Sequence, residues 1–248
     1  MKIETCLSNF DSVSLNDLSS VRLMDRIDTK FVFQKQKILD LFLALQPFYD
    51  VLEVNEQKIQ RYRSLYYDTD DRFFFNQHHN NRVNRNKVRF REYVDSGLVF
   101  LEIKLKNNKG KTMKKRVKVD VVPNVLSLEQ KKYINNITGQ DLILKPKQWI
   151  NFSRITFVDK LKTERLTIDL DLNFSNEEKS GSFGNIVVAE VKKERVAQSS
   201  KFKVIAKGHR ILPVRLSKYC MSTIDLDKDV KYNRFKEKLL LMNKLKKV

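Results

Sequence analysis

Apolar and polar residues alternate along much of this chain with a period of two, which is the period of a β-strand. The segment KVRFREY at 87–93 shows the pattern, because Val88 and Phe90 fall on one face and Arg89 and Arg91 on the other. Segments of this kind predict strands at 25–33, 49–54, 57–67, 86–95, 98–107, 112–121, 150–159, 163–173 and 185–194.

Hairpin-type turns join three of these predicted strands. Residues 95–97 read Asp-Ser-Gly, and residues 107–110 read Asn-Asn-Lys-Gly. Short connections rich in glycine, asparagine and aspartate are typical of β-hairpins, whose strands run in opposite directions. We therefore expect an antiparallel sheet.

Other segments repeat their apolar residues every three or four positions, which predicts helices. In 35–46, for example, Ile38, Leu41, Phe42 and Leu45 share one face. The same reasoning predicts helices at 12–20, 35–46, 69–80, 127–139, 198–208 and 229–247.

Two of these helices also carry signals at their ends. Thr69 and two aspartates open the helix at 69–80, since hydroxyl and carboxylate oxygens accept hydrogen bonds from the first helical N–H groups. Ser127 is a cap with Gln130 in the capping-box position, and Gly139 ends that helix.

Eight or nine antiparallel strands with short helices between them indicate an α+β protein. Strands in this number commonly close into a barrel, because closure removes exposed edges. We therefore expect a closed antiparallel β-barrel of about eight strands around a tunnel, decorated with short α-helices. Only six glycines and four prolines occur and no linker is visible, so residues 1–248 are expected to form a single domain.

The charge of the chain is strongly positive. It has 49 lysines and arginines against 30 acidic residues, a formal net charge of +19. Such a field attracts polyanions, which include nucleic acid, anionic lipid, nucleotides and polyphosphate. Charge alone does not choose among them.

Cysteine usage and the length of the apolar segments bear on the cellular location of the protein. The two cysteines, Cys6 and Cys220, lie near opposite ends of the chain, and neither a disulfide framework nor a metal-binding cysteine spacing is present. No apolar run is long enough to cross a bilayer, and the N-terminus lacks a signal-peptide core. We expect a cytoplasmic protein. The basic amphipathic segment 229–247 is interpreted as a solvated terminal helix, with docking to the inner face of an anionic membrane or to a membrane protein as the alternative.

Basic residues recur at alternate positions on strand after strand. The pairs and triplets are Arg61 and Arg63; Arg89 and Arg91; Lys104 and Lys106; and Lys114, Arg116 and Lys118. On one strand, such a pattern is best explained as a solvated face. Recurrence on several strands favours a polyanion site, because a solvated face normally mixes signs and like charges across strands repel.

A few carboxylates stand among these cations. Glu102 precedes Lys104 by two residues, Glu190 precedes Lys192 by two, and Asp169 follows the basic position 165. Ion pairing within the sheet explains this spacing, and so does a divalent metal beside bound phosphates, since Mg²⁺ and Mn²⁺ use one or two carboxylates plus phosphate oxygens. The spacing leaves both readings open.

Eight short motifs in order resemble the VTC catalytic domain, the polyphosphate polymerase of the vacuolar transporter chaperone complex, which belongs to the triphosphate tunnel metalloenzymes. They are RIDTKF at 26–31, YRSLYYDT at 62–69, KVRFREY at 87–93, LEIK at 101–104, KKR at 114–116, ERLTID at 164–169, VAEVK at 188–192 and LSKY at 216–219. The resemblance covers about 22–222, which would be the barrel core. It departs from the superfamily pattern in one place, where Asp28-x-Lys30 replaces E-x-E-x-K.

The resemblance implies a barrel whose bore is lined with lysine and arginine, acting on ATP and inorganic polyphosphate with Mn²⁺ or Mg²⁺. It assigns the tunnel bases to Lys30, Arg89, Arg91, Lys104, Lys114, Arg165 and Lys218. Weaker transfers are Arg61, Arg63, Arg116 and Lys192. Glu190 would be the metal ligand.

The function that this resemblance implies is transfer of the γ-phosphate of ATP to a growing polyphosphate chain. A tripolyphosphatase or nucleoside triphosphatase on the same barrel is the alternative, with water as acceptor. A nucleic-acid-binding protein suits the net charge but is disfavoured, because the basic residues occupy strand interiors and no helix-turn-helix is present. A catalytically idle phosphate-binding subunit is the last alternative.

Overall fold

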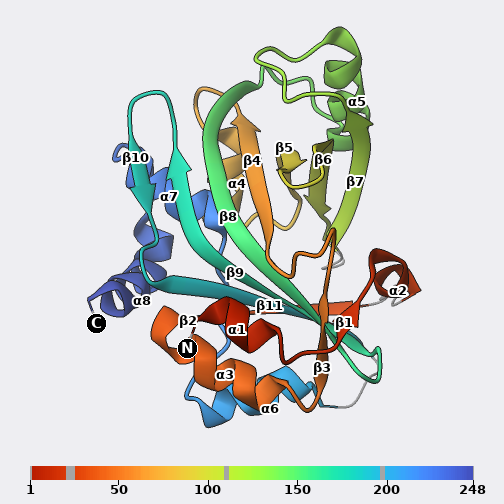
Figure 1. Cartoon of the computed structure of the whole chain (residues 1–248). Coiled ribbons are helices and arrows are strands. Elements are labelled where there is room, and N and C mark those ends of the chain that lie inside the picture. The colour runs from red at the N-terminus through yellow and green to blue at the C-terminus, as the bar shows by residue number, and fades with distance from the viewer. Residues whose placement is uncertain (1, 21–25, 109–111, 196–198, 248) are drawn as a thin grey trace.

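A single curled sheet dominates the computed structural model, which describes residues 2–20, 26–108, 112–195 and 199–247 (Figure 1). Eight of its eleven strands follow the hydrogen-bonded order β2–β11–β9–β8–β4–β5–β6–β7. In that order they span Arg26–Gln34, Ile186–Glu194, Glu164–Ser175, Lys145–Asp159, Gln60–Asp68, Arg85–Tyr93, Leu98–Lys106 and Thr112–Val119. All neighbours along this path are antiparallel, as the hairpin turns predicted.

Three short strands join the sheet at its margins. They are β1 (Ser12–Val13), β3 (Tyr49–Leu52) and β10 (Ser180–Ser182). β3 pairs with β8, β10 pairs with β9, and β1 runs parallel to β3.

Within the described ranges, eight short α-helices and two 3₁₀ turns lie around the sheet. The α-helices are α1 (Ile3–Leu7), α2 (Leu15–Ser20), α3 (Ile38–Leu45), α4 (Phe73–His79), α5 (Leu128–Thr138), α6 (Lys201–Gly208), α7 (Lys218–Leu226) and α8 (Lys236–Lys246). The 3₁₀ turns are η1 (Lys35–Lys37) and η2 (Asn233–Phe235). The predicted α+β class, with an antiparallel sheet of about eight strands around an interior and short α-helices beside it, is confirmed, and the sheet forms a half-barrel where a closed barrel was expected.

The two end strands of the path, β2 and β7, are not paired with each other in the described ranges. They nevertheless border one cavity, because Lys30 of β2 and Lys114 of β7 both line it. The sheet therefore curls around an interior in the manner of a half-barrel (Figure 1).

The convex face of the sheet forms two hydrophobic cores with helices. Strands β2, β11, β9 and β8 pack against α1, α3 and α6, with Phe42 and Phe157 fully buried between them. Strands β4, β5 and β6 pack against α5, where Phe90, Leu101 and Ile134 are buried. Alternation along each strand thus sends apolar side chains outward to the helices and leaves the other set for the interior.

The concave face is covered in part by α7, which packs together with α4 and α8 on that side of the sheet (Figure 1). Tyr219 of α7 stacks on Tyr66 of β4 with ring centroids 5.0 Å apart. The helix at 218–226 has no counterpart among the predicted elements. Most of its residues are buried, so it lacks the polar face that a periodicity search requires.

The observed ends of two helices can be compared with the predicted caps. The helix at 127–139 is confirmed, with reciprocal bonds between Ser127 and Gln130 and a left-handed Gly139 at φ 67°. The predicted start at Thr69 is wrong by four residues, since α4 begins at Phe73. Its first N–H groups are bound by the Thr69 hydroxyl and by the carboxylate of Asp68.

Two further predictions need correction. The segment 12–20 is a short strand followed by α2, rather than one helix. The tail at 229–247 contains η2 and then α8, whose Met242 is buried and whose Leu239 and Leu245 pack against the core under α7. Its apolar face is therefore used within the chain, while Leu240 stays 69% exposed.

Candidate functional site

The interior of the curled sheet holds a cavity of about 210 Å³. All eight strands of the main path, β4 included through Tyr66, and the start of α7 contribute to its lining. The charged lining residues are Arg26, Asp28, Lys30, Lys87, Arg89, Arg91, Glu102, Lys104, Lys114, Arg154, Asp169, Glu190, Lys192 and Lys218. Ten are basic and four acidic, a formal excess of six positive charges.

Strand β5 shows how the sequence directs its cations inward. Val88 and Phe90 are completely buried in the outer core, so Lys87, Arg89 and Arg91 must point to the opposite face. That face is the cavity.

Glu102 of β6 is the centre of the first of three carboxylate clusters. Its carboxylate accepts hydrogen bonds from Arg89 Nε at 2.9 Å and Nη2 at 2.6 Å, forms an ion pair with Lys114, and lies 4.0 Å from Arg91 Nε. Although burial opposes ionisation, Arg89 and Arg91 hold the pKa of Glu102 well below its usual range. Burial lowers the pKa of Lys114 to about 7 despite this partner.

Asp169 of β9 is the centre of the second cluster. Its two oxygens accept bonds from Arg154 Nε at 2.6 Å and Nη2 at 2.8 Å, and Lys218 contacts the second oxygen. Burial opposes ionisation, yet Arg154 and Lys218 hold the pKa of Asp169 well below its usual range. Burial also lowers the pKa of Lys218 to about 7.

Glu190 of β11 is the centre of the third cluster. Its carboxylate lies 2.8 Å from Lys30 Nζ and 4.0 Å from Lys192 Nζ. Burial raises the pKa of Glu190, but Lys192 and Lys30 outweigh it and hold the pKa well below the ordinary value. A buried carboxylate that stays ionised is the form that binds a metal.

A divalent cation fits this third cluster only together with ligand oxygens. No group of three or more acidic, histidine or cysteine side chains in the described part of the chain could hold a metal alone. One or two carboxylates completed by phosphate oxygens are the usual arrangement for Mg²⁺. Glu190 supplies one, and Asp28 lies on the neighbouring strand as the register partner of Lys192.

The cavity brings together most of the predicted site residues. Those that line it are Lys30, Arg89, Arg91, Lys104, Lys114, Lys192, Lys218 and Glu190. Those that do not are Arg61, Arg63, Arg116 and Arg165.

Arg61 and Arg63 lie on the outer face of β4. Arg61 Nη2 pairs with Asp95 at 2.7 Å, and Arg63 Nη1 lies 3.4 Å from Glu92. The guanidinium of Arg63 also covers the ring of Trp149 at 4.5 Å. Both arginines have partners outside the cavity.

Arg165 and Arg116 lie on the cavity-facing sides of β9 and β7 but beyond the cavity itself. Arg165 Nη2 donates to the carbonyl of Leu18 in α2 at 2.8 Å. The Arg116 guanidinium lies 4.6 Å from the ring centroid of Phe100.

Three cavity cations, Arg26, Lys87 and Arg154, are not among the predicted site residues, although Arg26 opens the motif at 26–31. Lys87 is two residues before Arg89, so continuing the alternation by one step would have found it. Arg154 stands alone in NFSRITF, and only its pairing with Asp169 across β8 and β9 reveals its place.

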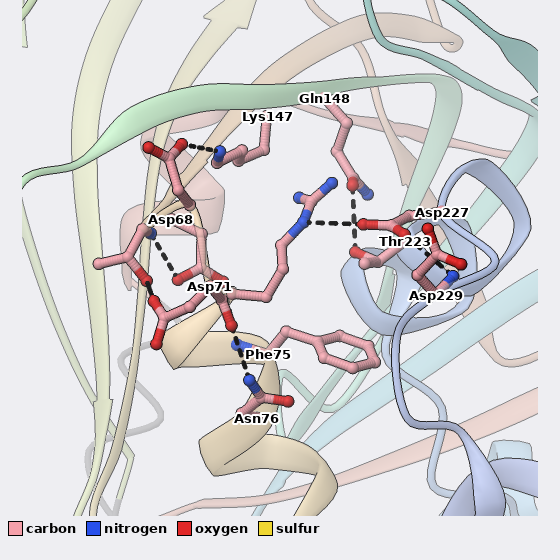
Figure 2. Close-up of polar contacts among 12 residues, drawn as sticks. Asp68, Asp71, Phe75, Asn76, Lys147, Gln148, Thr223, Asp227 and Asp229 are labelled. Atoms are coloured by element: carbon pink, nitrogen blue, oxygen red, sulfur yellow. Dashed lines mark hydrogen bonds and ion pairs between the residues drawn. The ribbon is translucent and has the colours of Figure 1, made fainter.

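A larger cavity of about 1130 Å³ lies elsewhere, outside the curled sheet. Its lining has six acidic and six basic residues, so it has no preference for a polyanion. Figure 2 shows the polar contacts beside it, where Lys147 and Gln148 of β8 face the start of α4 and the end of α7. Gln148 accepts from the Thr223 hydroxyl at 3.0 Å, and Arg72 Nε lies 3.4 Å from Asp227. These contacts tie α7 in place.

The fold and the cavity define a class of protein, in which an antiparallel sheet curls around a cation-lined interior. Residues 25–226 match the VTC domain family, and the chain belongs to that family. Membership supports an enzyme of polyphosphate or triphosphate metabolism. No curated protein matches the chain.

Solved structures resemble the chain only distantly. A putative adenylyl cyclase from Hippeastrum, HpAC1, described as having a dominant triphosphatase activity, is 14% identical with a TM-score of 0.47, covering 82% of this chain and 97% of its own. A conserved hypothetical protein from Pyrococcus furiosus is 15% identical with a TM-score of 0.42, covering 79% and 99%. Likeness at this level carries no argument about function.

None of the helices within the described ranges is both long and apolar enough to span a bilayer.

Proposed function

We propose that the chain is a metal-dependent polyphosphate polymerase that transfers the γ-phosphate of ATP to a growing polyphosphate chain inside the cavity. The observation that carries this proposal is the excess of cations around three ionised carboxylates, two of them buried and Glu190 partly buried. Phosphoryl transfer needs positioning and charge stabilisation more than covalent chemistry.

The cavity residues have separable roles in this proposal. Arg89 and Arg91 neutralise phosphate oxygens from β5, and Arg154 and Lys218 do so from β8 and the start of α7. Glu102 and Asp169 fix the directions of these side chains through the contacts described above. Pre-oriented charges stabilise a transition state without reorganising when the reaction occurs.

Glu190 would hold Mn²⁺ or Mg²⁺, with Asp28 on the neighbouring strand as a second oxygen donor. When bound, such an ion supplies a Lewis acid that withdraws charge from phosphate oxygens. Lys30 is 2.8 Å from Glu190 and would turn towards the phosphates once the carboxylate binds the ion.

The acceptor in this proposal is a terminal phosphate oxygen of the polyphosphate chain. Since that oxygen is already anionic, no protein nucleophile is required. In agreement, the described cavity lining contains neither histidine nor cysteine.

One observation favours a second candidate, a tripolyphosphatase or nucleoside triphosphatase. The cavity is only about 210 Å³, which suits a triphosphate better than a long chain. Water would then replace the phosphate acceptor while the protein residues keep their roles.

The test is incubation with ATP and Mn²⁺, followed by gel analysis of the products for wild type, Glu190→Gln and Glu178→Gln. Glu178 is exposed and is not part of the cavity lining, so its variant is the matched control. We expect a ladder of polyphosphate that Glu190→Gln lowers about 10²–10³-fold, in line with loss of one charge-stabilising group. Calorimetric titration with Mn²⁺ should show weaker binding in the same variant.

Each other outcome has a definite meaning. Release of free phosphate without a polyphosphate ladder would assign the triphosphatase activity in place of the polymerase activity. Full activity in Glu190→Gln removes Glu190 as the metal ligand. If neither polyphosphate nor free phosphate is formed, the chain is a non-catalytic polyanion-binding protein.

A further inference from the structure

The row of cations on β5 and β6 continues beyond the cavity. Arg85 lies two residues before Lys87, and Lys106 two residues after Lys104, so both share the inward face of their strands. Arg85 and Lys106 are direct register partners, as are Lys87 and Lys104. The cavity lining includes Lys87 and Lys104 but stops short of the outer pair.

Two more cations from other segments meet this outer pair. Lys87 Nζ donates to the Ser217 hydroxyl at 2.8 Å, which brings the segment carrying Arg215 against β5. Lys238 of α8 lies over the ring of Phe235, which packs against α4.

The pKa values support this proximity. After burial, the neighbours that lower the pKa of Lys106 are Arg85 and Arg215. Burial lowers the pKa of Lys238, and so do Arg215 and Arg85, although Cys220 and Glu237 oppose them. We name Arg85, Lys106, Arg215 and Lys238 the outer cation group.

The outer cation group lacks the compensation found inside the cavity. No carboxylate of the described residues lies within 4.0 Å of its four charged heads, whereas Glu102, Asp169 and Glu190 each bind two or more cations. Like charges held together without counter-charges destabilise the folded chain. An anionic ligand would remove that repulsion.

The length of the cationic row exceeds what a triphosphate needs. The side chains of Arg85, Lys87, Arg89 and Arg91 occupy alternate positions of one strand. At about 3.3 Å per residue, this row is roughly 20 Å long. A linear chain of phosphates that fills the cavity would reach the outer cation group as it leaves.

We propose that Arg85, Lys106, Arg215 and Lys238 bind the part of a linear inorganic polyphosphate chain that extends beyond the cavity. This inference rests on the proposed function, and it adds that the preferred ligand is a long chain rather than a triphosphate. Polyphosphate is favoured over nucleic acid or an anionic membrane, because the row continues from the cavity through Lys87 and Lys104 without interruption.

The test compares binding of tripolyphosphate with binding of a polyphosphate of several tens of phosphates, by calorimetry without turnover. The variant carries Arg85→Gln, Lys106→Gln, Arg215→Gln and Lys238→Gln. The control variant carries Lys131→Gln, Lys132→Gln, Lys201→Gln and Lys207→Gln, which are exposed positions on α5 and α6. Both variants lose the same charge.

For the outer variant we expect the Kd of the long chain to rise about ten-fold or more, with a shallower dependence on salt. The Kd of tripolyphosphate should change less than about two-fold, because its cavity contacts are intact. The single variant Lys238→Gln should show the same length-dependent loss on a smaller scale. An unchanged melting temperature with tripolyphosphate bound confirms that the variant is folded.

Three results would overturn the proposal. One is equal loss for both ligands, the second is no loss for the long chain, and the third is an equal loss in the control variant. Titration with phosphatidylserine vesicles and single-stranded DNA separates the rivals. If the variant of the outer cation group no longer binds the vesicles or the DNA but still binds the long polyphosphate chain, the group binds another partner and the proposal is wrong.

The proposed function can fail separately from this inference. An inactive protein that binds long chains through the outer cation group retains the inference and loses the polymerase. If the protein is a polymerase whose affinity for long chains does not depend on the outer cation group, the proposed function stands and this inference is wrong.

Discussion

Strands β4 and β5 are hydrogen-bonded neighbours, and each carries two arginines separated by one residue. On β5, Arg89 and Arg91 enter the cavity, and the Arg91 side chain is only 8% exposed. On β4, Arg61 and Arg63 face outward, and the Arg61 side chain is 65% exposed. The same spacing thus gives a buried anion-binding wall on one strand and a solvated surface on the next.

The residues between the arginines account for this difference. Val88 and Phe90 are apolar and occupy the outer core, which forces the arginines of β5 inward. On β4 the intervening positions are Tyr62 and Ser64, which face the interior, and Tyr62 stacks on Phe152 there. A repeated basic pattern therefore shows that two residues share a face, whereas their neighbours decide which face it is.

The largest expected effect is on catalysis. Arg91→Gln should lower turnover of ATP about 10³-fold, because it removes a charge aimed into the cavity. Arg63→Gln, the outward counterpart, should change turnover less than about two-fold, since exposed pairs contribute little. Steady-state rates of both variants make the measurement. Equal losses would show that the outer face of β4 also belongs to the site.

A smaller effect is expected on stability. Glu102→Gln leaves Arg89, Arg91 and Lys114 without their shared counter-charge, so the free energy of unfolding should fall by about 3 kcal/mol. Glu92→Gln, which loses only the exposed partner of Arg63, should cost less than about 1 kcal/mol. Denaturant titration gives both values. Added tripolyphosphate should restore part of the loss in Glu102→Gln only.

The smallest effect is expected from pH, and it separates the same two surfaces. Burial lowers the pKa of Lys218 to about 7 from an ordinary 10.5. Between these values the unfolded chain binds the proton and the folded chain does not, so stability without ligand should rise with pH over that interval. Bound phosphates favour the charged lysine, so their affinity should fall a few-fold from pH 7 to 9.

Melting curves and calorimetry check these two opposite trends. Binding of tripolyphosphate at pH 8 should take up protons, which a change of buffer ionisation enthalpy detects. Lys218→Met should remove most of this uptake, whereas Lys201→Met, an exposed control, should leave it unchanged. Proton release on binding would contradict the buried, neutralised lysine.

The sequence predicted much of the fold because alternation, turns and caps act locally. It predicted nine strands of the sheet within a few residues at most ends, although β8 begins at Lys145 rather than 150 and the short strands β1 and β10 were missed. The family motifs grouped Lys30, Glu190, Arg89 and Arg91 in one predicted site, and all four line the cavity. It could not place Arg165, which is directed to Leu18 by the fold, or Arg154, whose partner Asp169 is fifteen residues away on another strand.

Helix α7 gives the cavity a cation that needs no further ordering. Lys218 is the first residue of a helix whose other residues, except Asp225, are buried, and the Tyr219 hydroxyl beside it donates to Asp68. The backbone of Lys218 cannot move unless this core unpacks. Binding of a ligand therefore costs little conformational entropy of the protein at this residue. Core residues of α7 therefore influence the affinity for phosphate as well as the stability of the fold. A substitution there would weaken phosphate binding under conditions in which the chain is still folded.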